Sequence, residues 1–236
     1  WWIYGDKRPG LYKAISVLER TVAVPQTSKW AVPAFVSTRQ VLSMMTIVFP
    51  YDDYGHFGVL SSAVHLVWVI AHGSTLETRL RYTPSDVFEP FPLPASQGRP
   101  EWNRIEEVGE ALDRFRADLM IRTDLGLTKT YNRVHNPDER DPDVVRLREL
   151  HVELDHAVLD AYGGSDLELD HHHWETPQGV RFTVGPAARD ELLDRLLELN
   201  HERYAAEVAA GLHDKKAKKA PAKKAGKKTV DPGQES

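Results

Sequence analysis

A row of charged residues near the middle of the chain has the types that read DNA bases. Glu77, Arg79 and Arg81 alternate with uncharged residues over Leu76–Tyr82, which predicts one strand with all three charges on a single face. In the major groove an arginine can donate to guanine O6 and N7, and a glutamate can accept from cytosine N4. The alternative is an ordinary solvent-exposed face of a sheet.

A second candidate is the histidine run at residues 171–173, which follows Asp170 and precedes Glu175. Three adjacent side chains cannot all point the same way in a helix or strand, so the run is a poor single metal site. We expect a surface loop here. A metal-dependent hydrolase that uses the His171 region is the weakest of the alternatives left open.

Other motifs for catalysis are absent from the sequence. The chain has no cysteine, no Gly-x-Ser-x-Gly, no glycine-rich nucleotide loop, no His-Glu-x-x-His and no EF-hand pattern. The acids at 106, 107, 110 and 113 fall on a solvated helix face, which does not suit paired acid–base work. We therefore predict no catalytic, cofactor-binding or metal-binding residue in this chain.

Several polar residues lie beside apolar helical stripes, where buried side chains need hydrogen-bond partners. We expect them to be structural rather than catalytic: His65, Tyr131, Asn132, His151 and Asn200.

Charge is divided unevenly along the 236 residues, whose net charge is −5. Residues 1–100 hold 9 basic and 7 acidic side chains, and residues 101–213 hold 13 basic and 25 acidic ones. Residues 214–236 hold 8 lysines and 3 acids in a low-complexity Lys/Ala/Pro sequence, which predicts a disordered tail. The tail could add salt-sensitive contacts to phosphates or simply keep the chain soluble.

The front of the chain is predicted to be rich in strands, because Val, Ile, Thr and aromatic residues are broken up by prolines. A helical stripe then extends from Phe57 to Ala71, and its polar residues interrupt any run of the ~20 apolar residues needed to span a membrane. The expected strands are Tyr12–Val17, Thr21–Pro25, Trp30–Ser37 and Val41–Phe49.

The back of the chain is predicted to be helical. A proline-rich connector at Phe88–Pro94 precedes an apolar stripe from Trp102 to Leu119. Asp141 and Pro142 are typical of a helix start, and that helix should end near Gly163. A short strand at 180–184 and a last helix at 187–212 complete an α+β fold.

Several ordered motifs resemble those of the MmeI-like, or type IIL, bacterial DNA methyltransferases. The first is HFGVLSSAVHLVW at 56–68, and it is followed by RYTPSDVFEPFPLP at 81–94. The others are GLTKTYN at 126–132, LRELHVELDHAVLDAYG at 147–163 and LLELNHER at 196–203. Together the matches cover the chain from its start to about residue 207.

The resemblance implies a function for each part of the chain. Residues 1–95 would be a target-recognition domain that reads double-stranded DNA, and 96–212 a helical C-terminal domain, followed by the tail at 213–236. The family transfers a methyl group from S-adenosylmethionine to adenine N6 in restriction-modification or other anti-phage systems. Its Asn-Pro-Pro-Tyr motif and glycine-rich cofactor motif are absent from these 236 residues, and we expect them upstream of Trp1 in a longer protein or on a neighbouring polypeptide.

The leading prediction is therefore a DNA-recognition segment of an adenine methyltransferase, inactive by itself and located in the bacterial cytoplasm or on the nucleoid. Glu77, Arg79 and Arg81 would read bases. The candidates for phosphate contacts are Lys7, Arg8, Lys29 and Arg39. The alternative is a free-standing, non-enzymatic DNA-binding or assembly protein, which the reading frame upstream of Trp1 would distinguish. No membrane partner is expected.

Overall fold

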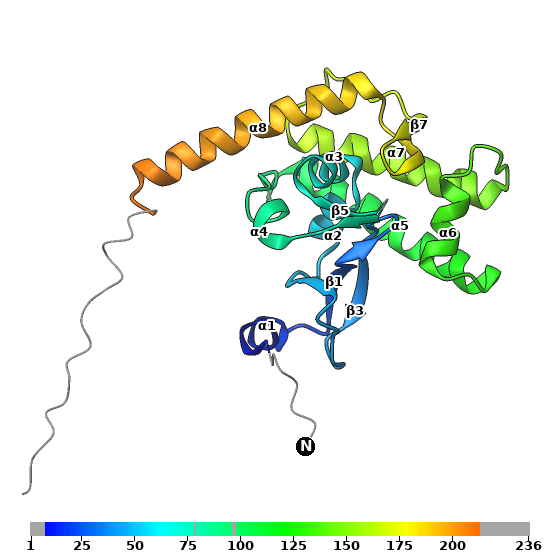
Figure 1. The fold of residues 1–236 in the computed structure, drawn as a ribbon, viewed down its shortest axis with the longest axis horizontal. Coiled ribbons are helices and arrows are strands. Elements are labelled where there is room, and N and C mark those ends of the chain that lie inside the picture. Colours follow the sequence, from blue (N-terminus) through cyan, green and yellow to red (C-terminus); the bar gives the residue numbers. More distant parts are fainter. Residues whose placement is uncertain (1–7, 78, 96–97, 213–236) are drawn as a thin grey trace, which may run out of the picture. The chain divides into compact units, whose positions relative to one another are not determined.

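The computed structural model describes residues 8–77, 79–95 and 98–212. Residues up to Asn200 pack as one compact unit, and those from His201 onward belong to a second. The larger unit mixes small antiparallel sheets with helices (Figure 1), so the predicted α+β class is confirmed. Its hydrophobic core is continuous from β1 to α8, and the predicted boundary at residue 95 remains a prediction. The predicted tail lies outside the described residues.

Within the described residues, the front strands form a three-stranded antiparallel sheet in the order β3-β1-β4. The central strand β1 (Arg20–Pro25) is buried from Thr21 to Val24 and pairs with β3 (Ala34–Ser37) and β4 (Thr46–Phe49). Both partners are shorter than predicted. The start of the predicted 30–37 strand is a loop that contains Pro33, and residues 38–45 connect β3 to β4.

The first element is a helix, α1 (Pro9–Ile15), so the predicted strand Tyr12–Val17 is wrong. Pro9 occupies the first turn, where the fixed φ of proline favours a helix and its missing N–H costs nothing. Arg8 precedes it in the left-handed region at φ 42°. Ile15 is the buried residue of this helix, Tyr12 is half-buried, and Ala14 and Val17 are exposed.

The predicted helix from Phe57 to Ala71 is two helices, α2 (Tyr54–Ser61) and α3 (Ala63–His72). Ser62 between them is extended, and its hydroxyl accepts from the His65 N–H. The Ala63 N–H donates to the carboxylate of Asp155, 2.6 Å away. These side chains satisfy the N–H groups that a new helix leaves unpaired, which is why the chain can bend inside a continuous apolar stripe.

His65 is buried in α3 and is held by two hydrogen bonds. Its Nδ1 lies 3.0 Å from the Leu60 carbonyl, and its Nε2 lies 3.0 Å from the Tyr82 hydroxyl. A carbonyl can only accept, so Nδ1 carries the proton and the neutral ring accepts from Tyr82. Burial lowers the pKa of His65 to about 4. The prediction that this histidine is structural is confirmed.

In the described part of the chain no single helix is long and apolar enough to cross a membrane. Helices α2 and α3 reach the required length and composition only together, and they are bent by 56° relative to each other.

The two long helices α5 (Pro100–Thr123) and α7 (Pro142–Ala161) follow the predicted apolar stripes and pack together with α2. Gly109 lets α5 approach α2 closely, because a Cβ there would lie 2.6 Å from the Tyr54 carbonyl oxygen. The predicted start of α7 is confirmed, since the Asp141 carboxylate accepts from the Asp143 N–H at 2.9 Å.

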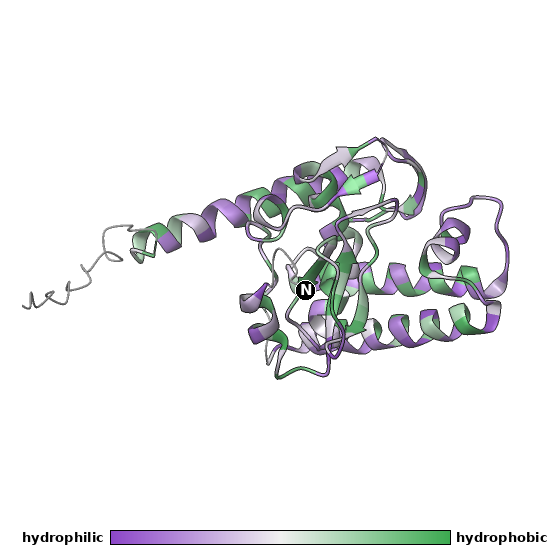
Figure 2. Ribbon diagram, turned by 60° about the horizontal axis from the view of Figure 1, so that its bottom comes forward, coloured by the Kyte–Doolittle hydropathy of each residue, from purple (hydrophilic) through white to green (hydrophobic). Residues whose placement is uncertain are grey.

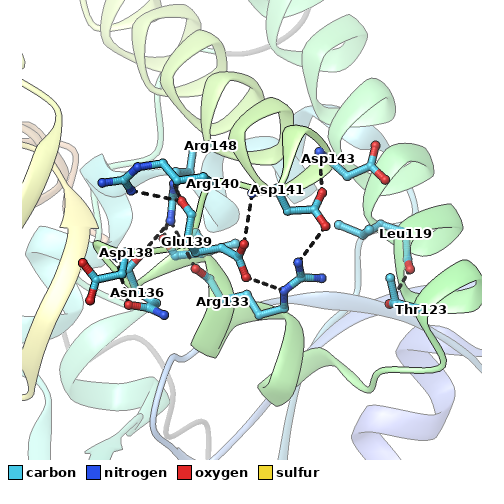
Figure 3. A network of polar contacts seen from close by, with 11 residues as sticks. Leu119, Thr123, Arg133, Asn136, Asp138, Glu139, Arg140, Asp141, Asp143 and Arg148 are labelled. Carbon is cyan, nitrogen blue, oxygen red and sulfur yellow. Dashed lines mark hydrogen bonds and ion pairs between the residues drawn. The ribbon is translucent and has the colours of Figure 1, made fainter.

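Helix α6 (Leu127–Val134) is joined to α7 by a loop that two arginines hold. The Arg133 guanidinium contacts Glu139 at 2.7 Å and Asp141 at 2.8 Å (Figure 3). Arg148, from α7, donates to the backbone carbonyls of four residues around the turn: Arg133, Val134, Asn136 and Glu139. The loop is thereby tied to α7 without burying an unpaired carbonyl.

The histidine run begins a hairpin and is not the surface loop predicted from the sequence. Strand β7 (His172–Thr176) pairs with β8 (Gly179–Thr183), and Gly179 has the positive φ of 100° that this tight turn requires. The side chain of His171 is buried 2.8 Å from Asp155. Pairing with β8 and the contact of His171 with Asp155 on α7 therefore determine the conformation of this segment.

The last described helix is α8 (Pro186–Ala209), close to the prediction. Its buried residues Ala188, Leu192 and Leu196 recur at helical spacing, and Asn200 donates to the Pro90 carbonyl. Helical ribbons alternate between green and purple along their length (Figure 2), as expected for helices with one buried face.

We expect Asp155→Ala to lower the free energy of unfolding by about 3–4 kcal/mol, because it leaves the Ala63 N–H and the His171 ring without their buried partner. Asp118→Ala removes only an exposed ion pair with Arg122 and should cost less than about 1 kcal/mol. Urea unfolding followed by circular dichroism measures both. Equal costs for the two variants would contradict the role assigned to Asp155.

We also expect the free energy of unfolding to decrease when the pH is lowered, because His65 becomes protonated more easily in the unfolded chain. Its folded pKa of about 4 lies below the unfolded value of 6.5, so the unfolded chain binds more protons between these values. The contribution is complete above pH 6.5 and is lost as the pH falls toward 4, by about 3 kcal/mol.

The measurement is the free energy of unfolding at several pH values between 4 and 7. His65→Asn should flatten part of this dependence, whereas His156→Asn, at an exposed position of α7, should leave it unchanged. Burial also lowers the pKa of His151, to about 4, and the pKa values of His135 and His173, so these histidines contribute to the remaining slope. An unaltered pH profile for His65→Asn would rule the assignment out.

Candidate nucleic-acid interface

The charged row predicted on one strand lies on a hairpin. Strand β5 (Ser74–Leu76) pairs with β6 (Arg79–Arg81), with Leu76 opposite Arg79. Glu77 lies in the turn at φ 58°, so the single strand predicted over Leu76–Tyr82 is wrong. A strand pattern with period two cannot distinguish one long strand from two short ones when no glycine marks the turn.

The two arginines do share one face, as predicted. Arg79 and Arg81 are exposed on β6, and Leu80 between them is 2% exposed and packs into the core. Successive side chains of a strand point to opposite faces, so burial of Leu80 turns both guanidinium groups toward solvent. The hairpin therefore presents two cations, two residues apart, on one solvent-facing side.

Glu77 is brought to the same surface by an ion pair. Its carboxylate lies 2.6 Å from the Arg79 guanidinium. The Glu77 side chain is 72% exposed and the Arg79 side chain is 50% exposed. An exposed pair of this kind adds little stability, so it serves mainly to orient Arg79. Within the described residues Arg81 has no ion-pair partner, which leaves its full charge available to a ligand.

Strand β6 is held on its other side by β2 (Thr27–Ser28), in a three-stranded sheet ordered β2-β6-β5 among the described strands. The next residue, Tyr82, donates its N–H to Gln26 at 2.7 Å, and its hydroxyl contacts His65. Trp68 on α3 donates to the Val87 carbonyl in α4 (Pro84–Val87). The segment that follows Arg79 and Arg81 is thus held against α3 at two places.

The four residues predicted to contact phosphates are in different situations. Arg39 is 82% exposed and lies 3.7 Å from Glu19. Arg8 donates to the backbone carbonyls of Ser43 and Thr46 and therefore supports the loop before β4. Lys7 lies outside the described residues. Arg39 is thus an exposed cation of this set, in the turn that follows β3.

Lys29 is drawn toward the helical part of the chain. Its ammonium group lies 3.3 Å from Asn132 Oδ1 and 4.3 Å from the centre of the Trp30 ring. The indole N–H of Trp30 also donates to Asn132, at 3.0 Å. The structural role expected for Asn132 is confirmed, and the same holds for the Tyr131 hydroxyl, 2.8 Å from His151.

A group of exposed apolar residues beside the hairpin was missed by the sequence analysis. Val41, Met44 and Met45 are 71%, 73% and 53% exposed in the loop before β4. The Met45 carbonyl accepts from Gln26, whose own carbonyl accepts from Tyr82, so this loop adjoins the strand end that carries Arg81. Two adjacent methionines within the predicted strand Val41–Phe49 were the feature of the sequence that could have indicated this exposed group.

The histidine region offers little for a metal. In the ranges that the structure describes, no group of three or more His, Asp or Glu side chains is arranged to hold a metal ion. His171 is bonded to Asp155, which also accepts from Ala63. These contacts give His171 and Asp155 a structural role, since they join the start of α3 to the residue before β7.

Comparisons with known proteins found matches to the front part of the chain and to most of its length. Residues 7–95 match the family model described as MmeI, target recognition domain. The chain is 28% identical over 160 residues to DNA methyltransferase A of Bacillus subtilis (strain 168), a match that covers 66% of this chain and 17% of that protein.

A solved structure shares the fold. The type IIL restriction-modification enzyme MmeI, in complex with DNA, superposes with a TM-score of 0.56 at 23% identity, over 80% of this chain and 22% of that one. The chain spans about a fifth of the length of these two relatives. The resemblance seen in the sequence is confirmed: residues 7–95 are similar to the MmeI target recognition domain, and the fold resembles that of the MmeI structure.

Proposed function

We propose that this chain supplies sequence recognition of double-stranded DNA to an S-adenosylmethionine-dependent adenine methyltransferase of a restriction-modification or anti-phage system. The observation that carries the proposal is a solvent-facing pair of arginines, Arg79 and Arg81, on the β5–β6 hairpin of a domain whose family is named for target recognition. The methyltransferase part, with its Asn-Pro-Pro-Tyr and cofactor motifs, would come from another segment or polypeptide, and the complex would act on the bacterial nucleoid.

The chemistry of the hairpin suits base reading. An arginine that donates two hydrogen bonds to guanine discriminates against the wrong base by about 1–3 kcal/mol. Glu77 either orients Arg79 or accepts from a cytosine amino group once Arg79 turns to a base. Arg39 and, with smaller effect, Arg8, Lys7 and Lys29 would contact phosphates, which adds affinity without selecting a sequence.

We expect Arg79→Ala and Arg81→Ala to relax base preference at one position each of the recognised sequence, by about 5- to 100-fold. The experiment selects bound duplexes from a randomised pool with the full chain, then titrates the enriched duplex and its single-base variants. Arg39→Ala is the matched control, and it should weaken binding to all duplexes alike and lower the dependence on salt by about one counterion.

Two outcomes would contradict different parts of the proposal. If both hairpin variants keep the wild-type preference, the assignment of base-reading residues is wrong although DNA recognition stands. If the wild-type chain enriches no sequence and binds no duplex even at low salt, the proposed function itself is wrong.

A further inference from the structure

Arg181 on β8 is an arginine buried without a charged partner. The residue is 1% exposed, and among the described residues no carboxylate lies within ion-pair distance of it. Its Nη2 donates to the Lys29 carbonyl, but Nε and Nη1 are buried with no hydrogen-bond partner. A buried charge in this state is unfavourable unless an anion or other acceptor completes it.

Arg181 lines a partly open cavity of about 60 Å³ to which both the front part of the chain and the helical segment contribute residues. Its lining includes Trp30 and Ser61 from the front part of the chain, and His135, His151 and Phe182 from the back part. A volume of this size exceeds that of one water and is large enough for an ion of a few atoms. It is much too small for a nucleobase.

The lining of this cavity includes the carboxylate of Asp155, whose two oxygens are already occupied, Oδ1 by the Ala63 N–H and Oδ2 by the His171 ring. Some other polar groups of the lining are donors that lack a partner. The hydroxyl of Ser61 is buried without a partner. His135 accepts from the Phe182 N–H through Nδ1, so its neutral ring carries the proton on Nε2. Burial and the charge of Arg181 hold the pKa of His135 well below its usual range, which keeps this ring neutral.

Arg181 itself remains charged at neutral pH. Burial lowers its pKa, but only to about 10. Its guanidinium lies 4.8 Å from the centre of the Trp30 ring, and that stacking does not use its N–H groups. One buried positive charge, two unused guanidinium donors and an unused hydroxyl therefore adjoin the same small space.

We propose that this cavity binds a small monovalent oxyanion, of the size of formate, acetate or bicarbonate, which pairs with Arg181 and tightens the contact between the recognition domain and the helical segment. The oxygen atoms of such an anion would accept from Arg181 and from the Ser61 hydroxyl after small side-chain adjustments. Because Arg181 also holds the Lys29 carbonyl, the anion would stabilise the loop that follows β2, the strand paired with β6.

The test is thermal unfolding of the full chain in sodium formate or acetate, against sodium chloride at equal ionic strength. We expect a saturable rise in Tm of about 3 °C or more with the carboxylates. Benzoate, which exceeds the cavity, should give no rise. Arg181→Met should abolish the response, and Arg122→Met, at an exposed position of α5, should keep it.

The proposal is overturned if chloride or benzoate gives the same rise as formate, or if Arg181→Met retains it. Should Arg181→Met fail to fold, the relaxation of ¹³C-formate with the unmodified chain decides. Line broadening that acetate reverses and benzoate does not supports the site. The absence of broadening, or broadening that benzoate reverses equally, removes it.

Discussion

The hydrogen bond from the Ala63 N–H to Asp155, 92 residues away in sequence, is the contact on which the position of the β5–β6 hairpin depends. It stabilises a helix start in the middle of an apolar stripe, where the N–H groups of the first turn would otherwise be buried unpaired. That start sets the direction of α3. From α3, His65 reaches Tyr82 and Trp68 reaches Val87, one on each side of the turn that follows β6. A carboxylate on α7 thus determines where Arg79 and Arg81 are presented.

Two buried arginines also join the helical segment to the front part of the chain, through hydrogen bonds to backbone carbonyls. Arg116 on α5 donates to the Pro33 carbonyl at 3.0 Å, and Arg181 donates to the Lys29 carbonyl. These bonds hold both ends of a loop in which Ala31 has a φ of 50°, an unfavourable conformation for alanine. Bonds to backbone carbonyls depend little on the side chains of the loop, so a side-chain substitution in this loop can leave its attachment to the helices unchanged.

Elements with strong local signals were predictable from the sequence, and those decided by distant contacts were not. The start of α7 follows from Asp141 and Pro142, which are adjacent, and the apolar stripe of α5 is uninterrupted. The break at Ser62 needs Asp155, and the burial of His171 needs the same carboxylate. The hairpin turn at Glu77 uses a positive φ without glycine. For the site, the types and shared face of the two arginines were predictable, but the adjacent methionine loop was not.

The acidic balance of the back half does not oppose an approach of DNA to the hairpin. Many of these acids are paired on their own helices, as Glu110 is with Arg114 and Glu191 with Arg195. Exposed charges more than about 8 Å apart are largely screened at physiological salt, so DNA at the hairpin would respond mainly to Arg79, Arg81 and their neighbours. The remaining negative charge on the helical segment would then disfavour binding in other orientations, and orientation is what a domain that reads bases must establish before any base contact forms.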